Sequence, residues 1–228
     1  MNENGGDAMP NRGIDREGND YLDRVIEDRR TIRAFTGEVP PREHIEAIIR
    51  AGLLAPYSPM SVGSEEIFRR FVVIEAGSRE RAAAVDMIRR KVIESTEALS
   101  QAAAANPEFG RMAQAFLGRL STIAEGAEIG IESAPYYIVV AEKKGFPPVE
   151  PRSLAHCMEN MWLKATALGL GLRLISATSQ MADDEEFCRL IDIPAGEFGF
   201  DGCVVGYPAQ DFPPTRRPPF DEALKWLS

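Results

Sequence analysis

The sequence predicts a layered fold in which helices cover both faces of a central β-sheet. Apolar residues make up 44% of the 228 residues and charged residues 27%, the balance of an ordinary soluble globular domain. Helical and strand-type patterns alternate along the chain, as they do where a sheet lies between helices. No repeat and no long internal linker divides the sequence. We therefore expect a flexible polar tail at 1–18 and a single domain at 19–228.

Two helices and a strand are expected in the first third of the chain. The segment 19–30 places apolar residues on one helical face behind an Asn-Asp pair that can cap it. A second helix begins after Pro41 and continues to residue 53, with apolar residues at i, i+3, i+4, i+7 and i+8. A Ser/Pro/Gly-rich loop at 56–64 then leads to an apolar strand at 71–75.

The remaining two thirds continue the alternation of helices and strands. A β-branched and aromatic run at 136–141 predicts a buried strand, and the spacing at 152–168 predicts a long helix capped by Gly169. The other expected elements are helices over 78–133 with breaks at 106–107 and 126–130, a short helix starting at the acidic run 183–186, a terminal helix at 221–227, and strands at 172–177 and 202–207. Periodicity alone does not predict the order of the strands.

Charge and cysteine content exclude several classes of function. The chain has 26 Lys and Arg against 35 Asp and Glu, a net charge of −9, which repels nucleic acids and anionic membranes. Three cysteines without a C-x-x-C pair and two histidines predict neither a disulfide framework nor a metal site. The polar start lacks the apolar core of a signal peptide, and no run is long enough to span a membrane. We therefore expect a cytoplasmic protein with no nucleic-acid or membrane partner.

Two local motifs have ordinary structural explanations. The run GLGLR at 169–173 lacks the third glycine of a dinucleotide-binding turn and leads from a helix into a strand, the reverse of that turn. His156 and Cys157 are neighbours in a helix and point about 100° apart, so they cannot form a catalytic pair. The sequence also lacks the phosphate-loop and G-x-S-x-G motifs of ATPases and serine hydrolases.

Two basic clusters are more informative. Arg29, Thr31 and Arg33 alternate after the first helix, and they bring guanidinium groups and a hydroxyl together in a way that suits a phosphate. Arginine at the end of a helix is also favoured by the helix dipole, so a purely structural role stays open. A second cluster, Arg216 and Arg217, lies in a proline-stiffened segment and could complete a phosphate clamp.

Several segments in a fixed order resemble one known family. RRTIRAFTGEVPPREHIEAIIRAGLLAP at 29–56 is similar to the start of the FMN-dependent nitroreductase family. APYYIVVAEK at 134–143 and HCMENMWLKATALGLGLRLISA at 156–177 resemble its central strand, its core helix and its G-L-G strand entry. VVGYPAQDFPPTRRPP at 204–219 resembles its G-Y-P and its Pro/basic segment. Each motif is weak alone, and their order makes the resemblance specific.

The resemblance implies an α+β fold with three layers (α/β/α), in which helices flank a mixed, mostly antiparallel central sheet. It also implies an intertwined homodimer with FMN bound at the interface and NAD(P)H as co-substrate. Because the chemistry of such enzymes is carried by the flavin, no catalytic side chain and no metal is expected. An acceptor such as a nitroaromatic or a quinone would be reduced in a ping-pong cycle.

The family's cofactor-binding positions can be carried over residue by residue. They place Arg29, Arg30, Thr31 and Arg33 near the FMN phosphate and the pyrimidine edge, with Arg29 or Arg30 stabilising charge on the reduced flavin. Pro56, Tyr57 and Ser58 correspond to the loop that covers the flavin from the partner subunit. Backbone groups of Ser176, Ala177 and Thr178 would approach the ring. Arg216, or less clearly Arg217, would bind the phosphate, and Arg33 with Arg216 would clamp it.

The sequence departs from the family pattern in the loop before the first strand. The family commonly has A-P-S-S-x-N-x-Q-P-W, whereas APYSPMSVGSEEIFRRF at 55–71 has Tyr57 in place of the first Ser, lacks the Asn and the Gln-Pro-Trp, and is longer. The acceptor therefore stays open, as do other chemistries on this fold: dehalogenation, flavin fragmentation and peptide dehydrogenation. A flavin-binding module without turnover is the non-enzymatic alternative.

A mobile cover over the substrate side of the flavin is expected at 107–125. Phe109, Met112 and Phe116 recur at helical spacing there, and glycines lower the stability of the helix. An ordinary amphipathic helix packed on the core is the structural alternative.

Overall fold

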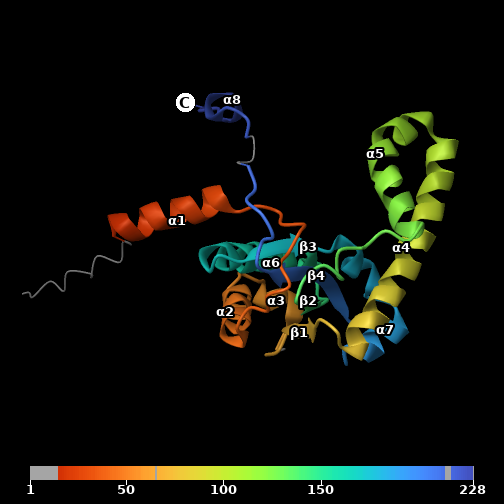
Figure 1. Cartoon of the computed structure of the whole chain (residues 1–228), viewed down its shortest axis with the longest axis horizontal. Helices are drawn as coiled ribbons and strands as arrows, with labels where there is room; N and C mark the ends of the chain where they lie inside the picture. The colour runs from red at the N-terminus through yellow and green to blue at the C-terminus, as the bar shows by residue number, and fades with distance from the viewer. Residues whose placement is uncertain (1–14, 65, 214–216, 228) are drawn as a thin grey trace, which may run out of the picture.

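The computed structural model describes residues 15–64, 66–213 and 217–227 of the chain. It is an α+β protein whose four-stranded sheet has the order β1-β2-β4-β3, as Figure 1 shows. The strands are β1 (Arg69–Glu75), β2 (Tyr136–Lys143), β3 (Gly171–Leu174) and β4 (Phe198–Gly206). Nine helical segments accompany them in the described ranges: α1 (Arg16–Asp28), α2 (Arg42–Leu53), α3 (Pro59–Val62), α4 (Arg79–Ala105), α5 (Pro107–Ala124), α6 (Glu150–Ala167), the 3₁₀ helix η1 (Ser176–Met181), α7 (Glu185–Leu190) and α8 (Phe220–Ala223).

All three strand pairings in the sheet are antiparallel. The resemblance implied a mixed sheet, and within the described residues the only parallel pairing is one isolated bridge, between Thr31 and Leu172. It does not grow into a ladder because the segment beyond it moves on to pair with the chain after β4, where Phe35 bridges Pro208. The sheet is therefore antiparallel, with one parallel contact at its β3 edge.

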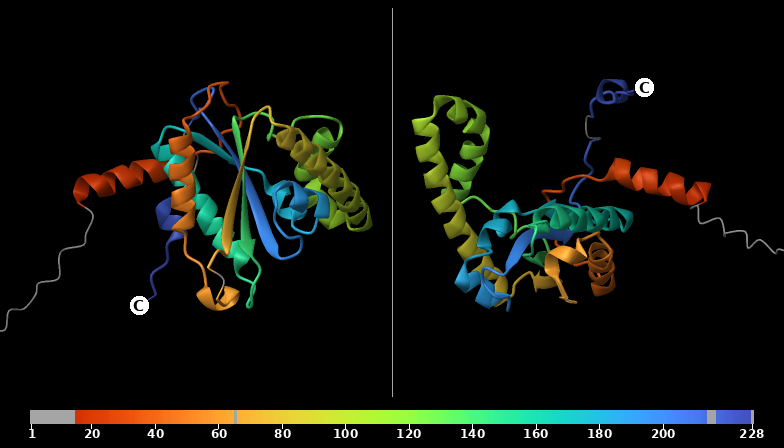
Figure 2. Two further views of the ribbon diagram at one scale, coloured as in Figure 1. Left: turned by 90° about the horizontal axis from the view of Figure 1, so that it is seen from below. Right: turned by 180° about the vertical axis from the view of Figure 1, so that it is seen from behind.

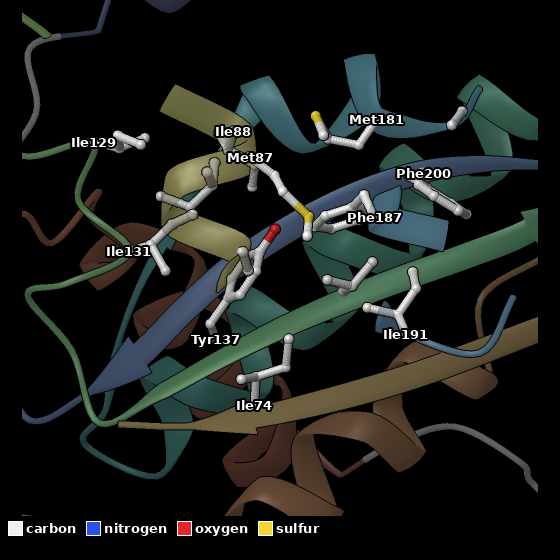
Figure 3. Packing of buried hydrophobic residues seen from close by; sticks show 14 of the residues in the cluster. Ile74, Met87, Ile88, Ile129, Ile131, Tyr137, Met181, Phe187, Ile191 and Phe200 are labelled. Atoms are coloured by element: carbon white, nitrogen blue, oxygen red, sulfur yellow. The ribbon is translucent and has the colours of Figure 1, made fainter. Parts of the chain in front are cut away.

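The buried residues of β2 alternate between two apolar clusters. Tyr137, Val139 and Ala141 face a cluster that includes residues of α4, η1 and α7, and Figure 3 shows Tyr137 among Met87, Phe187 and Phe200. Tyr136, Ile138 and Val140 face the other cluster, with residues of α2 and α6. Because alternate side chains of a strand point to opposite faces, this burial on both sides produces the three layers. The expected α/β/α arrangement is confirmed.

Most expected elements are confirmed, and the differences lie at their ends. Helix α1 begins at Arg16 because the side chain of Asp15 accepts a hydrogen bond of 2.7 Å from the backbone N–H of Gly18. The expected tail therefore loses its last residues to this helix, and 1–14 lie outside the described ranges. The loop at 56–64 contains the one-turn helix α3, and the strand expected at 172–177 ends at Leu174, where η1 follows.

Two further boundaries differ toward the C-terminus. Strand β4 begins at Phe198, before the expected start at residue 202, because its first half pairs with β2 up to Lys143. The expected terminal helix is a single turn, α8. In the described part of the chain, no helix is long and apolar enough to cross a membrane.

Three segments extend away from the layered core. Figure 2 shows α4 and α5 as a helical hairpin that continues beyond the edge of the sheet, while α1 and the C-terminal segment leave the core elsewhere. The hairpin turns at Asn106, whose side chain accepts hydrogen bonds of 3.1 Å from the N–H groups of Glu108 and Phe109. This cap and Pro107 at the start of α5 explain why the long helical region breaks where the sequence indicates.

Candidate functional site

A cleft of about 360 Å³ lies between the β3 edge of the sheet and the α4–α5 hairpin. Its lining comes from five parts of the chain: residues 31–33, the two hairpin helices, Ile129, Trp162 of α6, and the segment from Arg173 to Gln180. The volume is at the lower end of the range typical of small-molecule sites. A planar ligand would here contact both the sheet edge and the hairpin.

Backbone pairing assembles the sheet side of the cleft from distant segments. The N–H of Ile32 donates to the carbonyl of Leu172 (3.2 Å), and the N–H of Thr36 donates to the carbonyl of Tyr207 (2.9 Å). The close approach at β3 requires Gly171, because a Cβ there would lie 2.6 Å from the side chain of Ile32. Three of the four segments that carry the family resemblance, 29–56, 156–177 and 204–219, therefore meet at the β3 edge of the sheet.

Three arginines line the cleft: Arg33, Arg119 and Arg173. Among the described residues that line it, none is Asp or Glu. Burial, and after it the positive charges of Arg119 and Arg33, lower the pKa of Arg173 below its usual value. A positively charged cleft in a chain of net charge −9 is a local arrangement that favours an anionic ligand.

Arg173 is held in place by the loop before β2. Its Nη2 donates to the carbonyl of Ile129 at 3.0 Å. The guanidinium lies against Gly130, where φ is +101° and any Cβ would overlap it. Glycine is needed at this position for both its conformation and its lack of a side chain. The loop thus orients the arginine and leaves it at the cleft.

The opposite wall is one face of α5. Phe116, Arg119, Leu120 and Ile123 occur at i, i+3, i+4 and i+7 and all line the cleft. Phe116 is 55% exposed, so it can cover a ligand without being committed to the protein core. The wall combines apolar surface for a ring system with one cation.

Five of the residues predicted for the site lie in this cleft. Thr31 and Arg33 line it from the bridged segment, Ser176 and Ala177 from the start of η1, and Phe116 from α5. They come from three parts of the chain and are brought together only by the fold.

Three other predicted residues near these segments point elsewhere. The Arg29 guanidinium lies 4.6 Å from the centroid of the Trp162 ring and pairs with Glu159 at 3.2 Å. Arg30 donates from Nε to the carbonyl of Pro213 at 3.2 Å, beside a second hollow of about 320 Å³. Thr178 is fully buried and shares a 2.8 Å hydrogen bond with the hydroxyl of Tyr137. The side chain of Thr178 is therefore part of the core, and of these three side chains none lines the cleft.

The predicted covering loop lies outside the cleft of its own chain. The carbonyl of Pro56 accepts a hydrogen bond from Ser153 (3.1 Å), and the ring of Tyr57 stacks on Phe68 with centroids 3.8 Å apart. Ser58 accepts through its carbonyl from the hydroxyl of Ser61 (2.8 Å). These contacts place the loop next to the start of β1, at the edge of the sheet opposite to the β3 edge that forms the cleft.

Four predicted residues remain to be placed. Phe109 and Met112 of α5 do not line the cleft, and Met112 is 80% exposed, because the face directed at β3 begins only at Phe116. Arg217 is exposed near the C-terminus, and Arg216 lies outside the described residues. Of the three residues predicted to form the cover on α5, only Phe116 lines the cleft.

Sequence reasoning missed two of the three cleft arginines. Arg173 had a detectable signal, since it is the only charged residue between positions 168 and 182 and interrupts an apolar strand. Arg119 shares a helical face with Phe116 and Ile123, a pattern that is visible only when charged residues are included in the periodicity.

Metal and thiol chemistry find no support in the described parts of the chain. No three His, Cys, Asp or Glu side chains there are grouped as metal ligands would be. All three cysteines are buried, and burial raises the pKa of Cys157 to about 12, so its thiol stays protonated. None of the three cysteines lines the cleft.

The chain is similar to one family of known proteins in its sequence and in its fold. Residues 26–207 match the model of the family described as "Nitroreductase family". No curated protein matches the sequence significantly. Among solved structures, a nitroreductase with bound FMN from Bacteroides fragilis aligns with a TM-score of 0.65 and 18% identity, covering 91% of this chain and 98% of that one.

Two further structures show the same fold. A putative nitroreductase in complex with FMN from Desulfovibrio desulfuricans aligns with a TM-score of 0.61 and 21% identity over 91% of this chain and 96% of its own. A putative NADH dehydrogenase/NAD(P)H nitroreductase from Parabacteroides distasonis aligns with a TM-score of 0.58 and 18% identity, covering 88% and 95%. At these identities the likeness establishes the fold.

Proposed function

The chain belongs to the nitroreductase family, and we propose that it is an FMN-dependent oxidoreductase that uses NAD(P)H to reduce a small electron-poor acceptor. A nitroaromatic or a quinone would be such an acceptor. The FMN bound in similar nitroreductase structures supports the choice of cofactor.

The observation that carries this proposal is the joining of Thr31 and Arg33 with the 175–177 segment in one positively charged, partly apolar cleft. FMN has an apolar ring system, a polar pyrimidine edge and a doubly charged phosphate. The sheet side of the cleft fits these parts, since Ile175 and Ala177 offer apolar contact, Thr31 and the backbone near Ser176 offer polar contact, and Arg33 offers positive charge.

In the proposed mechanism the protein binds the cofactor, orients it and excludes water from the site. When bound, FMN supplies the hydride chemistry, taking two electrons from NAD(P)H and passing them to the acceptor. For a nitro group, one NAD(P)H and one solvent proton yield NAD(P)⁺, a nitroso group and water. Arg33 and Thr31 would fix the cofactor, while Phe116 and Leu120 would limit access of water from the α5 side.

The reaction should proceed without a protein acid or base in contact with the ring. The titratable side chains among the described residues of the cleft are its three arginines. Positive charge at the site would stabilise a reduced, negatively charged cofactor. Protons can therefore come from water.

We also propose that the active protein is a homodimer. A groove of about 280 Å³ between α1, α2 and α6 is lined by apolar residues that include Tyr21, Leu22 and Leu54, and all three are exposed. The C-terminal segment adds Trp226 and Leu227, each 85% exposed. A second copy would cover such surfaces and could bring its loop at 56–58 to the flavin.

An interface of this kind would bury more than about 2,000 Å². Sedimentation of the FMN-loaded protein at micromolar concentration should show a dimer. A monomer that is both loaded with FMN and active would contradict the dimer proposal.

The function is tested on the purified protein loaded with FMN. Under anaerobic conditions, NADH or NADPH should bleach the flavin absorbance, and a nitroaromatic or quinone should restore it. Bound flavin that neither nicotinamide can bleach would indicate a non-catalytic flavin-binding module. Failure to bind FMN at all would overturn the proposal itself.

A further inference from the structure

We propose that the acceptor reduced at this site carries an anionic group, and that Arg119 and Arg173 recognise it. This inference rests on the proposed function and adds the chemical class of the substrate. It is motivated by three arginines that converge on one cleft, of which the cofactor assignment uses only Arg33. A carboxylate or a sulfonate next to the reducible group would match the remaining two.

Two carboxylates, those of Glu132 and Glu128, lie close enough to act on the pKa of Arg173, and that of Glu132 is already engaged elsewhere. The oxygens of Glu132 interact with Arg89 at 3.2 Å and with the N–H of Gly130 at 3.0 Å. Arg173 itself makes one hydrogen bond in the described structure, to a backbone carbonyl, although a guanidinium carries five N–H donors. It therefore retains donors for a ligand.

The position of Arg119 distinguishes the acceptor from the cofactor. Thr31, Arg33 and the 175–177 segment belong to the edge of the sheet, whereas Arg119 projects from the α5 wall that faces this edge. A cofactor held by these sheet-side residues would leave the α5 side of the cleft to the acceptor. Arg119 shares that wall with Phe116 and Leu120, so one helical face offers both a ring contact and a cation.

The electrostatic field of the protein makes the cleft selective for anionic acceptors. Elsewhere the net charge of −9 disfavours anions, so an anionic acceptor gains only where arginines are concentrated. Planar guanidinium groups bind carboxylates and sulfonates through paired hydrogen bonds, which also orient the attached ring. A neutral acceptor of the same shape would leave the arginines without a partner.

A matched pair of acceptors tests this proposal: 4-nitrobenzoate and 4-nitrobenzamide, compared through kcat/KM on the FMN-loaded protein at fixed ionic strength. The two differ in reactivity, so the informative quantity is the benzoate/benzamide ratio of each variant relative to that of the wild type. Arg119→Gln should lower the ratio about tenfold or more, the loss expected for one charge-assisted contact. Arg173→Gln should lower it similarly, and the exposed position of Arg119 keeps the test valid if Arg173→Gln folds poorly.

Arg111→Gln is the control, because Arg111 is exposed on the same helix and does not line the cleft. It should leave the ratio unchanged. A second measurement avoids turnover altogether: calorimetric binding of 2-naphthoate and 2-naphthamide to the FMN-loaded protein. Arg119→Gln should weaken the naphthoate and spare the naphthamide.

Three outcomes would overturn the inference while leaving the proposed function intact. The ratio could be the same in Arg119→Gln as in wild type. The variant could lose affinity for FMN but not for riboflavin, which would place Arg119 on the cofactor phosphate. It could instead raise only the KM for NAD(P)H, which would place it on the dinucleotide. A wild-type protein whose flavin no nicotinamide bleaches would refute the proposed function, and this inference with it.

Discussion

Arg69 and Arg173 lie on the two edge strands of the same sheet, in opposite surroundings. Arg69 on β1 is only 4% exposed, and its guanidinium donates to the carboxylate of Glu142, the hydroxyl of Ser153 and the carbonyl of Gly52, at 2.7–2.9 Å. Arg173 on β3 has one carbonyl partner in the described structure and faces two other arginines. One arginine is neutralised inside the protein, and the other is not.

The difference teaches how to separate structural from functional charge in this fold. A buried ion pair with every donor used tolerates no change, because removal of one partner leaves the other as a bare buried charge. Positive charges gathered at a cleft repel one another, and a bound anion relieves this repulsion. The β1 edge therefore stabilises the fold, and we propose the β3 edge as the place for a ligand.

The largest expected effect comes from breaking the buried ion pair between Arg69 and Glu142. Arg69→Met should lower the free energy of unfolding by about 3–5 kcal/mol, because it leaves the carboxylate of Glu142 buried without its partner. Arg173→Met should change stability little, since it removes a cation from a repulsive cluster. Urea unfolding of both variants measures the contrast, and equal losses would contradict the distinction between the two edges.

The next effect tests the cofactor side of the cleft. Arg33→Ala should weaken FMN about 10- to 150-fold, the equivalent of a charge-assisted hydrogen bond of about 1.5–3 kcal/mol. Riboflavin lacks the phosphate, so its affinity should hardly change. Arg216→Ala should behave in the same way if that residue completes the clamp.

Arg217→Ala is the matched control for this test, and it should affect FMN less than either clamp variant. Fluorescence titration with both flavins measures the difference. Equal losses of FMN and riboflavin would indicate a general folding defect and remove the phosphate assignment of Arg33.

A third prediction concerns a carboxylate on the Glu142 face of the sheet that lacks such an arginine. Burial raises the pKa of Asp201 from 3.8 to about 6, although the N–H of Gly202 donates to it at 2.8 Å. The unfolded chain ionises at lower pH than the folded one, so this group's contribution to stability is lost as pH rises from about 4 to 6.

Asp201→Asn keeps the hydrogen-bond acceptor and removes the charge. It should stabilise the protein at pH 7 by about 1–2 kcal/mol, below the ~3 kcal/mol that two pKa units represent because part of the group stays hydrated. The gain should vanish at pH 3.5, where the wild-type carboxyl is also neutral. An equal gain at both pH values, seen in unfolding titrations, would mean that ionisation of Asp201 is not the cause.

The smallest effect sharpens the role of the α5 wall. Phe116→Ala should alter the relative kcat/KM for different acceptors by about fivefold, near 1 kcal/mol, and change FMN affinity less. Met112→Ala on the same helix should do neither, because Met112 does not line the cleft. Loss of folding, or equal loss of acceptor preference and FMN affinity, would favour an ordinary packing helix.

Local patterns predicted most of the fold. The β-branched run at 136–141 predicted a central strand because burial on both faces requires continuous apolar residues, and β2 confirms it. The break expected at 106–107 is confirmed, and the structure adds its cause, the cap that Asn106 provides at the start of α5. Errors occurred at ends such as Asp15, where one side chain moves the start of a helix by a turn.

The candidate site was predictable only in part. Thr31, Arg33, Ser176 and Ala177 could be proposed because they lie in motifs that retain their order along the chain. Arg119 could not be proposed in this way, since nothing within α5 indicates that this helix faces the β3 edge of the sheet. Thr178 was expected at the site through its backbone, by the family resemblance, and the structure shows that its side chain lies in the core, hydrogen-bonded to Tyr137.

The sequence by itself determined the helical and strand segments, the two-sided burial of β2, the acidic net charge and the order of the family motifs. These properties depend on interactions within a few residues or on composition. Only the tertiary structure decided that the sheet is antiparallel and that Arg33, Arg119 and Arg173 share one cleft, whose lining among the described residues includes no carboxylate. Contacts between distant segments depend on how all layers of the fold pack together, so a pattern within one segment does not predict them.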